Sequence, residues 1–192
     1  VQCLKNKDFD TAVSLYRNHR DVFTYRHNFI ALLNVCYNYA HLETAKEIFG
    51  TMKEEHPGAP VEQAYLALIR CHTANDAPRD RIEENIVLAK GLVEVMTAQN
   101  IEPRLRTYQP ILAALCRLGH LETAIALVRE MLDRGISPRA EQLGMLLTCA
   151  AHSGSLLTAS STTSSSPGEG SILRELLDVV GAISNGLLGI DM

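Results

Sequence analysis

The sequence predicts an all-α fold, a solenoid of roughly four to five helix–turn–helix repeats. The pentapeptide HLETA occurs at residues 41–45 and again at residues 120–124. In both copies the final alanine is followed seven residues later by methionine, and Ala89 leads to Met96 in the same way. The composition agrees with helix, because aromatic residues make up only 5% of the chain and Ala, Leu and Glu are frequent.

The repeat has a period of 35 residues. The related alanines are Ala12, Ala45, Ala89, Ala124 and Ala159. The last three are spaced by 35 residues and the first two by 33, whereas 44 residues separate Ala45 from Ala89. The extra residues fall in the polar segment NDAPRDRIEEN, where we expect a longer turn. A period of this length is typical of stacked supersecondary units.

The units follow one another along the chain. FDTAVSLY predicts a helix around Ala12, and units at residues 26–60 and 62–104 come next, the latter holding the insertion. The unit at residues 105–139 has the clearest pattern. Its first helix carries the apolar stripe Ile111, Leu112, Leu115 and Cys116, with Pro110 near the helix start and Gly119 as the C-cap.

The second helix of this unit carries Leu121, Ala124, Leu127, Val128 and Met131. It should end at Gly135, with Pro138 shortly beyond. A single hairpin cannot bury its own apolar faces, so neighbouring hairpins must stack and leave one concave surface. We expect the shared alanines to lie where two helices approach closely.

The repeat array is expected to span residues 1–152. Residues 153–171 include SSTTSSSPGEGS, a composition that indicates a flexible insertion or linker. Residues 172–192 should form the last helix and the start of a following connector. Its stripe is Ile172, Leu173, Leu176, Leu177 and Val180, and NGLLGIDM reads as a turn and a short strand.

Charge and hydropathy exclude some classes of protein. No apolar run reaches the 18 or so residues that cross a bilayer, and VQCLKNKDFD is no signal peptide. The net charge of −4 argues against a uniformly cationic nucleic-acid binder. Residues 103–139 nevertheless hold three acids and six arginines: Arg104, Arg106, Arg117, Arg129, Arg134 and Arg139. This local excess allows a phosphate-facing patch, although scattered surface arginines would give the same count.

The five cysteines form no C-x-x-C pair, so the usual zinc and redox signatures are missing. Four of them lie late in the first helix of successive units: Cys36, Cys71, Cys116 and Cys149. There a free cysteine packs well as a small apolar residue, and an unpaired odd count fits a reducing compartment. His41 and His120 occupy equivalent turns, and the adjacent Cys71 and His72 point in different directions on a helix, which disfavours a metal site.

TYQPILAALCRLGHLETAIALVREMLDRGISPR resembles a pentatricopeptide repeat. The shared residues are Tyr108, Leu112, Cys116, Gly119, Ala124, Met131, Gly135, Ile136 and Pro138. Within that superfamily, NIEPRLRTYQPILAALCRLG and the opening KNKDFDTAVSLYRNHRDVFTYRHNFIALLNVC resemble the repeats of protein-only ribonuclease P, over about the first 150 residues.

That resemblance implies an RNA-binding domain that holds the elbow of precursor tRNA while a separate metallonuclease domain removes the 5′ leader. The nuclease domain would bind Mg²⁺ and a connector would bind structural Zn²⁺. Beyond residue 150 the acids are only Glu169, Glu175, Asp178 and Asp191, so these residues should bind RNA without cleaving it. The expected compartment is organellar (mitochondrial) or nuclear.

In such repeats the fifth and last positions of each unit read a base. Here they are Ile30 with Pro60, Leu66 with Arg104, and Gln109 with Arg139. Apolar side chains cannot hydrogen-bond a base edge, so we expect recognition by shape and phosphate instead. The candidate RNA contacts are Arg104 and Arg106 first, then Gln109, Arg139, Asn28 and Leu66. Asn28 could equally cap a helix, and Tyr108 is expected to pack inside.

Two other functions stay open from sequence. One is a pentatricopeptide RNA-binding factor without a nuclease, acting in organellar RNA maturation or ribosome function. The other is a scaffold for protein partners, because tetratricopeptide repeats have a period of 34 residues.

Overall fold

A computed structural model describes residues 9–20, 25–55, 61–74, 79–152, 174 and 177–181. These residues form helices joined by short turns. No strand occurs among these residues. The predicted all-α class is therefore confirmed. The helices are α2 (Phe9–Asn18), α3 (Arg26–Asn38), α4 (Leu42–Glu55), α5 (Glu62–His72), α6 (Arg79–Ala98), α7 (Leu105–Leu118), α8 (Leu121–Asp133) and α9 (Ala140–His152).

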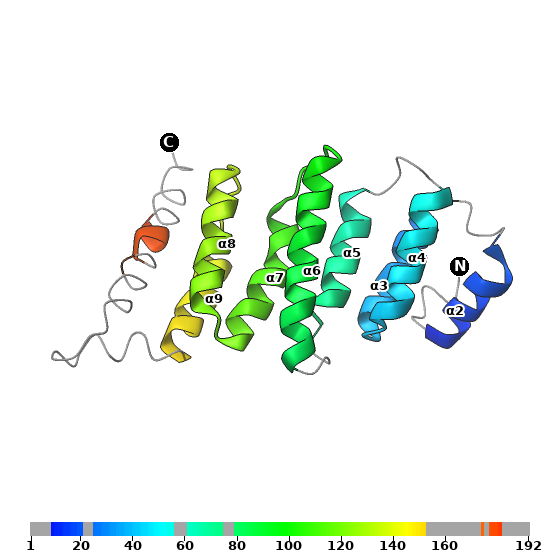
Figure 1. Cartoon of the computed structure of the whole chain (residues 1–192), viewed down its shortest axis with the longest axis horizontal. Coiled ribbons are helices and arrows are strands. Elements are labelled where there is room, and N and C mark those ends of the chain that lie inside the picture. Colours follow the sequence, from blue (N-terminus) through cyan, green and yellow to red (C-terminus); the bar gives the residue numbers. More distant parts are fainter. Residues whose placement is uncertain are drawn as a thin grey trace. The chain divides into compact units, whose positions relative to one another are not determined.

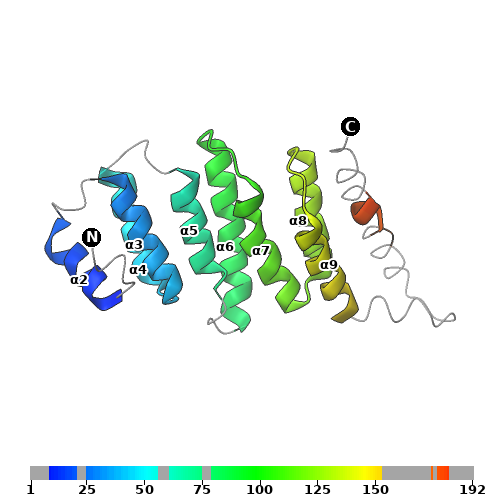
Figure 2. The same cartoon turned by 180° about the vertical axis from the view of Figure 1, so that it is seen from behind.

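The helices fall into two compact units, Val1–Pro103 and Arg104–Met192. In the first unit, α3 packs against α2, α4 and α5, and α5 also packs against α4 and α6 (Figures 1 and 2). In the second unit, α9 packs against both α7 and α8. Within each unit, the first helix of one hairpin thus contacts the first helix of the next, α3 with α5 and α7 with α9, as stacking requires.

The alanines of the repeat lie at the centre of this packing. Ala12, Ala45, Ala89 and Ala124 are each 0% exposed, which confirms the predicted role of the shared position. The methionines seven residues later, Met52, Met96 and Met131, are also 0% exposed. Two turns of helix separate each pair, so one face of each second helix is fully covered by its neighbours. Ala159 lies outside the described residues.

Two turns of the repeat need a left-handed backbone. The first follows the first helix of a hairpin, where Ala40 has φ 54° and Gly119 has φ 79°. The second follows the second helix, where Asn100 has φ 58° and Gly135 has φ 72°. Glycine and asparagine adopt this conformation readily, but Ala40 places a Cβ where the backbone disfavours it. The equivalence of Ala40 and Gly119 follows from the HLETA motif that begins immediately after each.

Some local expectations need correction. Pro110 lies inside α7, at its sixth residue, because Arg104 and Thr107 start the helix earlier than expected. In the last segment, Leu177 is 61% exposed and Val179 is 3% exposed, so the stripe predicted there is wrong at Leu177. The Ser-rich segment and the predicted strand of NGLLGIDM lie outside the described residues.

The cysteines late in the first helices pack in the core, as predicted. Cys36, Cys71 and Cys149 are buried and Cys116 is half-buried. Burial raises the pKa of Cys36, Cys71 and Cys116 to about 12. His72 is buried too, and its Nδ1 lies 3.4 Å from Oδ1 of Asn85. Burial lowers the pKa of His72, which keeps the imidazole neutral.

The described residues contain no cluster of three or more His, Cys, Asp or Glu side chains able to hold a metal ion. In the same part of the chain, every helix is too short or too polar to cross a membrane.

We predict that Ala124→Leu destabilises the second unit by about 1–3 kcal/mol, because Ala124 is 0% exposed and a larger side chain on α8 would overpack against α7 or α9. Ala124→Ser should cost much less. Urea denaturation followed by circular dichroism measures both free energies of unfolding. Equal losses for the two variants would contradict the close helix approach.

We also predict opposite effects at the two equivalent turns. Ala40→Gly should stabilise the first unit by roughly 0.5–1 kcal/mol, because it relieves the left-handed alanine. Gly119→Ala should destabilise the second unit by about 1 kcal/mol, and since no atom lies within 4 Å of the added Cβ, the cost is conformational. Thermal unfolding of both variants tests the pair, and a loss of stability in Ala40→Gly would contradict it.

Candidate RNA-binding surface

The second unit brings the candidate arginines to the starts of two neighbouring helices. Arg104 is the N-cap of α7 and Arg139 immediately precedes α9. The Arg104 N–H donates to Oγ1 of Thr107 at 3.2 Å, and the Arg139 N–H donates to Oε1 of Gln142 at 2.9 Å. This is half of a capping box, repeated 35 residues apart. It fixes the backbone at both positions while both arginine side chains stay exposed.

A hydrogen bond between side chains ties the two helix starts together. Nε2 of Gln109 on α7 donates to Oε1 of Glu141 on α9 at 2.8 Å. Arg106 is exposed one helical turn before Gln109, and Arg139 lies two residues before Glu141. Arg104, Arg106 and Arg139 therefore lie within about two helical turns of this bond.

The electrostatics of this surface suit a polyanion. The first turn of a helix presents backbone N–H groups and the positive end of the helix dipole, and two such ends meet here. Exposed guanidinium groups add full positive charges that bind phosphate oxygens in bidentate fashion. Glu141 is an opposing negative charge, and its bond to Gln109 engages the Gln109 amide that was expected to contact RNA.

Tyr108 and Arg134 belong to the packing between α7 and α8. Tyr108 is 1% exposed, and its hydroxyl donates to Oε1 of Glu130 at 3.2 Å. The same carboxylate oxygen pairs with Nη2 of Arg134 at 3.2 Å. Burial and the Glu130 charge raise the pKa of Tyr108 to about 12. The prediction that Tyr108 packs inside is confirmed.

Two of the residues predicted to contact RNA, Leu66 and Asn28, are buried. Leu66 is 7% exposed, because α5 is covered by α3, α4 and α6. Asn28 is also 7% exposed. Tyr25 is the N-cap of α3, and Asn28 is the third residue of that helix, the position that Thr107 holds in α7. Leu66 and Asn28 both belong to the first unit, whereas the arginines that precede or begin α7 and α9 belong to the second.

Sequence reasoning missed exposed aromatic side chains in the first unit. Tyr25 is 66% exposed and its ring stacks on His27, with centroids 5.6 Å apart. Tyr37 is 38% exposed, and the guanidinium of Arg70 lies 5.8 Å from its ring centroid. The repeat register could have found the first pair, because Tyr25 and His27 relate to α3 as Arg104 and Arg106 relate to α7.

The stacked antiparallel hairpins place the chain among helical-repeat proteins. A family model described as the pentacotripeptide-repeat region of PRORP matches residues 1–158. The chain belongs to this family of pentatricopeptide-repeat regions. A comparison with curated proteins gave no match.

Several solved structures share the fold. The pentatricopeptide-repeat domain of Arabidopsis thaliana protein-only RNase P 1 (PRORP1), solved in complex with tRNA, matches with TM-score 0.65 and 22% identity, over 92% of this chain and 94% of that domain. A. thaliana nuclear PRORP2 matches with TM-score 0.64 and 22% identity, over 91% of this chain and 40% of that chain. Maize PPR10 matches with TM-score 0.70 and 16% identity, over 96% of this chain and 23% of that chain. The chain thus spans less than half of PRORP2 and of PPR10.

We predict that Tyr108→Phe lowers the free energy of unfolding by about 1 kcal/mol, because the hydrogen bond to Glu130 is lost while the ring still packs. RNA affinity should not change. The control is Tyr25→Phe, where the hydroxyl is on an exposed ring and stability should stay the same. Denaturation and RNA-binding titrations of both variants provide the test, and a weaker RNA complex with Tyr108→Phe would contradict the packing role.

Proposed function

We propose that this chain is an RNA-binding repeat domain whose substrate is a folded precursor tRNA, held at its elbow region for removal of the 5′ leader. The observation that carries the proposal is the pair of helix starts in the second unit. Arg104, Arg106 and Arg139 are exposed there beside the bond between Gln109 and Glu141.

The chemistry of this surface favours the RNA backbone over base edges. Guanidinium groups and helix N-termini bind phosphates without regard to sequence. Gln109 is the polar side chain at a fifth position, and its amide nitrogen already donates to Glu141. Recognition of the fold of an RNA, by its shape and phosphates, suits such a surface. The match to a PRORP1 domain that was solved with tRNA supports tRNA as the class of RNA.

The aromatic side chains of the first unit offer RNA a different kind of contact. A base can stack on the Tyr25 ring or on the Tyr37 ring beside the Arg70 guanidinium, and stacking tolerates any base. Unpaired bases of a folded RNA would bind there, while the arginines of the second unit hold phosphates.

The activity of the whole protein forms a second part of the proposal. The family membership supports a parent protein of the ribonuclease P type, an endonuclease with its catalytic residues outside this repeat domain. Mg²⁺ and structural Zn²⁺ would bind in those other domains. An organellar or nuclear compartment, where precursor tRNAs are processed, fits this activity.

We predict that Arg104→Ala combined with Arg106→Ala weakens binding to a precursor tRNA and lowers the salt dependence of the association constant. Two lost phosphate contacts should reduce the slope of log K against log[salt] by roughly 1.4 to 1.8. Fluorescence anisotropy with labelled precursor tRNA, over a series of salt concentrations, gives both quantities.

The matched control is Arg81→Ala combined with Lys53→Ala, which removes two exposed charges on α6 and α4 and should leave the salt slope unchanged. If the variant with Arg104→Ala and Arg106→Ala kept its affinity and its salt slope, these two side chains would not contact RNA. If the unaltered chain bound no RNA, a protein scaffold would be the better assignment.

A further inference from the structure

In both units, two cysteines are neighbours across the first helices of successive hairpins. In the second unit, a side-chain hydrogen bond joins Cys116 on α7 to Cys149 on α9. In the first unit, Cys71 on α5 has its pKa raised to about 12 by burial and, after burial, by the neighbouring Cys36 on α3. Each pair bridges two helices that pack directly against each other, α7 with α9 and α3 with α5.

The hydrogen bond gives the two thiols of the second unit different roles. Burial raises the pKa of both thiols, and the hydrogen bond raises the pKa of Cys116 further but offsets part of the rise at Cys149. The Cys116 S–H therefore donates and the Cys149 sulfur accepts, so the Cys149 thiolate is the one that its neighbour stabilises. Cys116 is only half-buried, which places the pair at the edge of the contact between α7 and α9, within reach of a small molecule.

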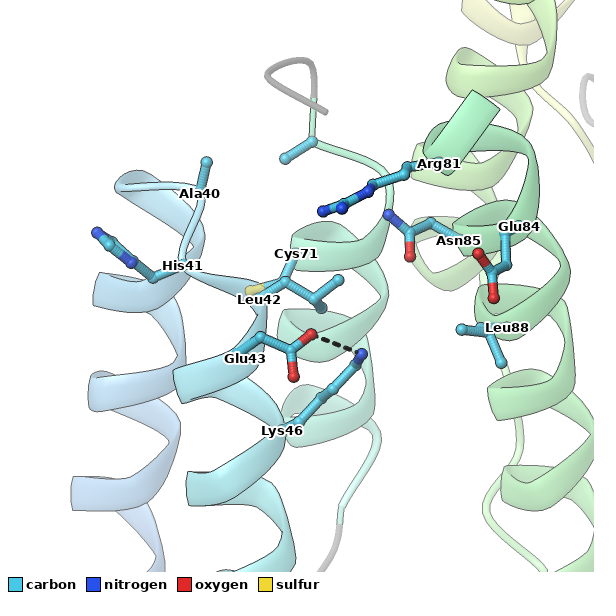
Figure 3. A pocket seen from close by; sticks show the side chains of 11 residues that line it. Ala40, His41, Leu42, Glu43, Lys46, Cys71, Arg81, Glu84, Asn85 and Leu88 are labelled. Atoms are coloured by element: carbon cyan, nitrogen blue, oxygen red, sulfur yellow. Dashed lines mark hydrogen bonds and ion pairs between the residues drawn. The ribbon is translucent and has the colours of Figure 1, made fainter. Parts of the chain in front are cut away.

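The cysteines of the first unit have different partners. The Cys71 thiol donates to the backbone oxygen of Leu33 at 3.9 Å, which favours the protonated form of Cys71. Burial raises the pKa of Cys36 to about 12, although a backbone hydrogen bond to its sulfur opposes that rise. Cys71 borders a cleft of about 610 Å³ between α4, α5 and α6 (Figure 3), so a small molecule can approach this thiol too. The two pairs thus differ in their hydrogen bonds more than in access.

We propose that Cys116 and Cys149 form an oxidation site, at which a peroxide converts the two thiols into a disulfide that joins α7 to α9. The Cys149 thiolate attacks one oxygen of hydrogen peroxide, the O–O bond breaks, and the departing hydroxide takes up a proton to give water. Cys149 is then a sulfenic acid. The Cys116 sulfur attacks the Cys149 sulfur, the S–S bond forms as the S–O bond breaks, and the departing hydroxide takes the Cys116 proton. Two thiols are oxidised, and one peroxide is reduced to two waters.

Cys116 does not have to react with the peroxide itself. Its pKa of about 12 keeps it a thiol, and it attacks only after Cys149 has been oxidised, when the two side chains are already neighbours. Cys149 is 2% exposed, so the first step should be slow and need sustained exposure to peroxide. In a reducing compartment such a bond is transient and reports the redox state.

The disulfide should stabilise the second unit. It closes a loop from Cys116 to Cys149 that contains the whole of α8, which lowers the conformational entropy of the unfolded chain. It also joins the later parts of α7 and α9, whereas the hydrogen bond between Gln109 and Glu141 joins their starts. The oxidised protein should therefore resist separation of these hairpins. This inference does not depend on RNA binding.

Peptide mapping of the full chain, treated with hydrogen peroxide while folded and kept free of reductant, tests the proposal. Trypsin cleaves after arginine, so Cys116 falls in the peptide 107–117 and Cys149 in the peptide 140–174. We expect these two peptides to be joined by a bond that a thiol reductant breaks. The peptides that carry the two cysteines of the first unit should stay unlinked.

Two serine variants test the order of the steps. In Cys116→Ser, Cys149 should still be oxidised and remain a sulfenic acid, which a carbon nucleophile such as dimedone captures. In Cys149→Ser, Cys116 should stay a thiol under the same exposure. The matched control is Cys71→Ser, because Cys71 is the tenth residue of α5 as Cys149 is of α9, and the bond in the second unit should still form. Circular dichroism confirms that each variant is folded.

The proposal is overturned if Cys116 and Cys149 stay thiols in the folded chain, or if they join only after urea has unfolded it. It is also overturned if Cys36 and Cys71 join equally fast, since the hydrogen bond between thiols would then not select the site. Urea denaturation of the unaltered chain adds a measurement that needs no variant. The peroxide-treated chain should unfold at a higher urea concentration than the same sample after reduction, and an equal or lower midpoint would contradict a cross-link within the native stack.

Discussion

The array depends on close contact at the alanine that begins the buried face of each second helix. Ala12, Ala45, Ala89 and Ala124 have no exposed surface, although each comes from a different hairpin. A hairpin of two short helices leaves too much apolar area in water to be stable alone, so each unit needs its neighbour. A small side chain at this position sets the distance between helices, and that distance fixes where every other side chain of the unit lies.

The same regular spacing produces the proposed RNA surface. Because α7 and α9 start in register, the backbone N–H of the residue before each helix donates to a side-chain oxygen of the third helical residue, Thr107 or Gln142. Arg104 and Arg139 are thus repeated in space because they are repeated in sequence. The proposed function resides in the side chains that vary at these repeated sites, with rings at the start of α3 and guanidinium groups at the start of α7.

The features that repeat along the chain could be predicted from the sequence alone. The alanine and methionine positions, the glycine turns and the buried cysteines follow from a 35-residue period and helical geometry, and the structure confirms them. The burial of Leu66 and Asn28 was not predicted, because the register alone does not tell how fully neighbouring helices cover a position. The Gln109–Glu141 bond could not be foreseen, since it joins residues 32 apart whose distance is set by the angle between α7 and α9.

The row of cysteines along the first helices has a practical consequence for the chemistry of the protein. A thiol with a pKa near 12 is a thiolate in only about one molecule in 10⁵ at neutral pH, and the thiolate is the form that reacts with electrophiles and oxidants. Cys36, Cys71 and Cys116 are therefore inert while their hairpins stay stacked. Alkylation of these sulfur atoms would record, hairpin by hairpin, how often the array opens.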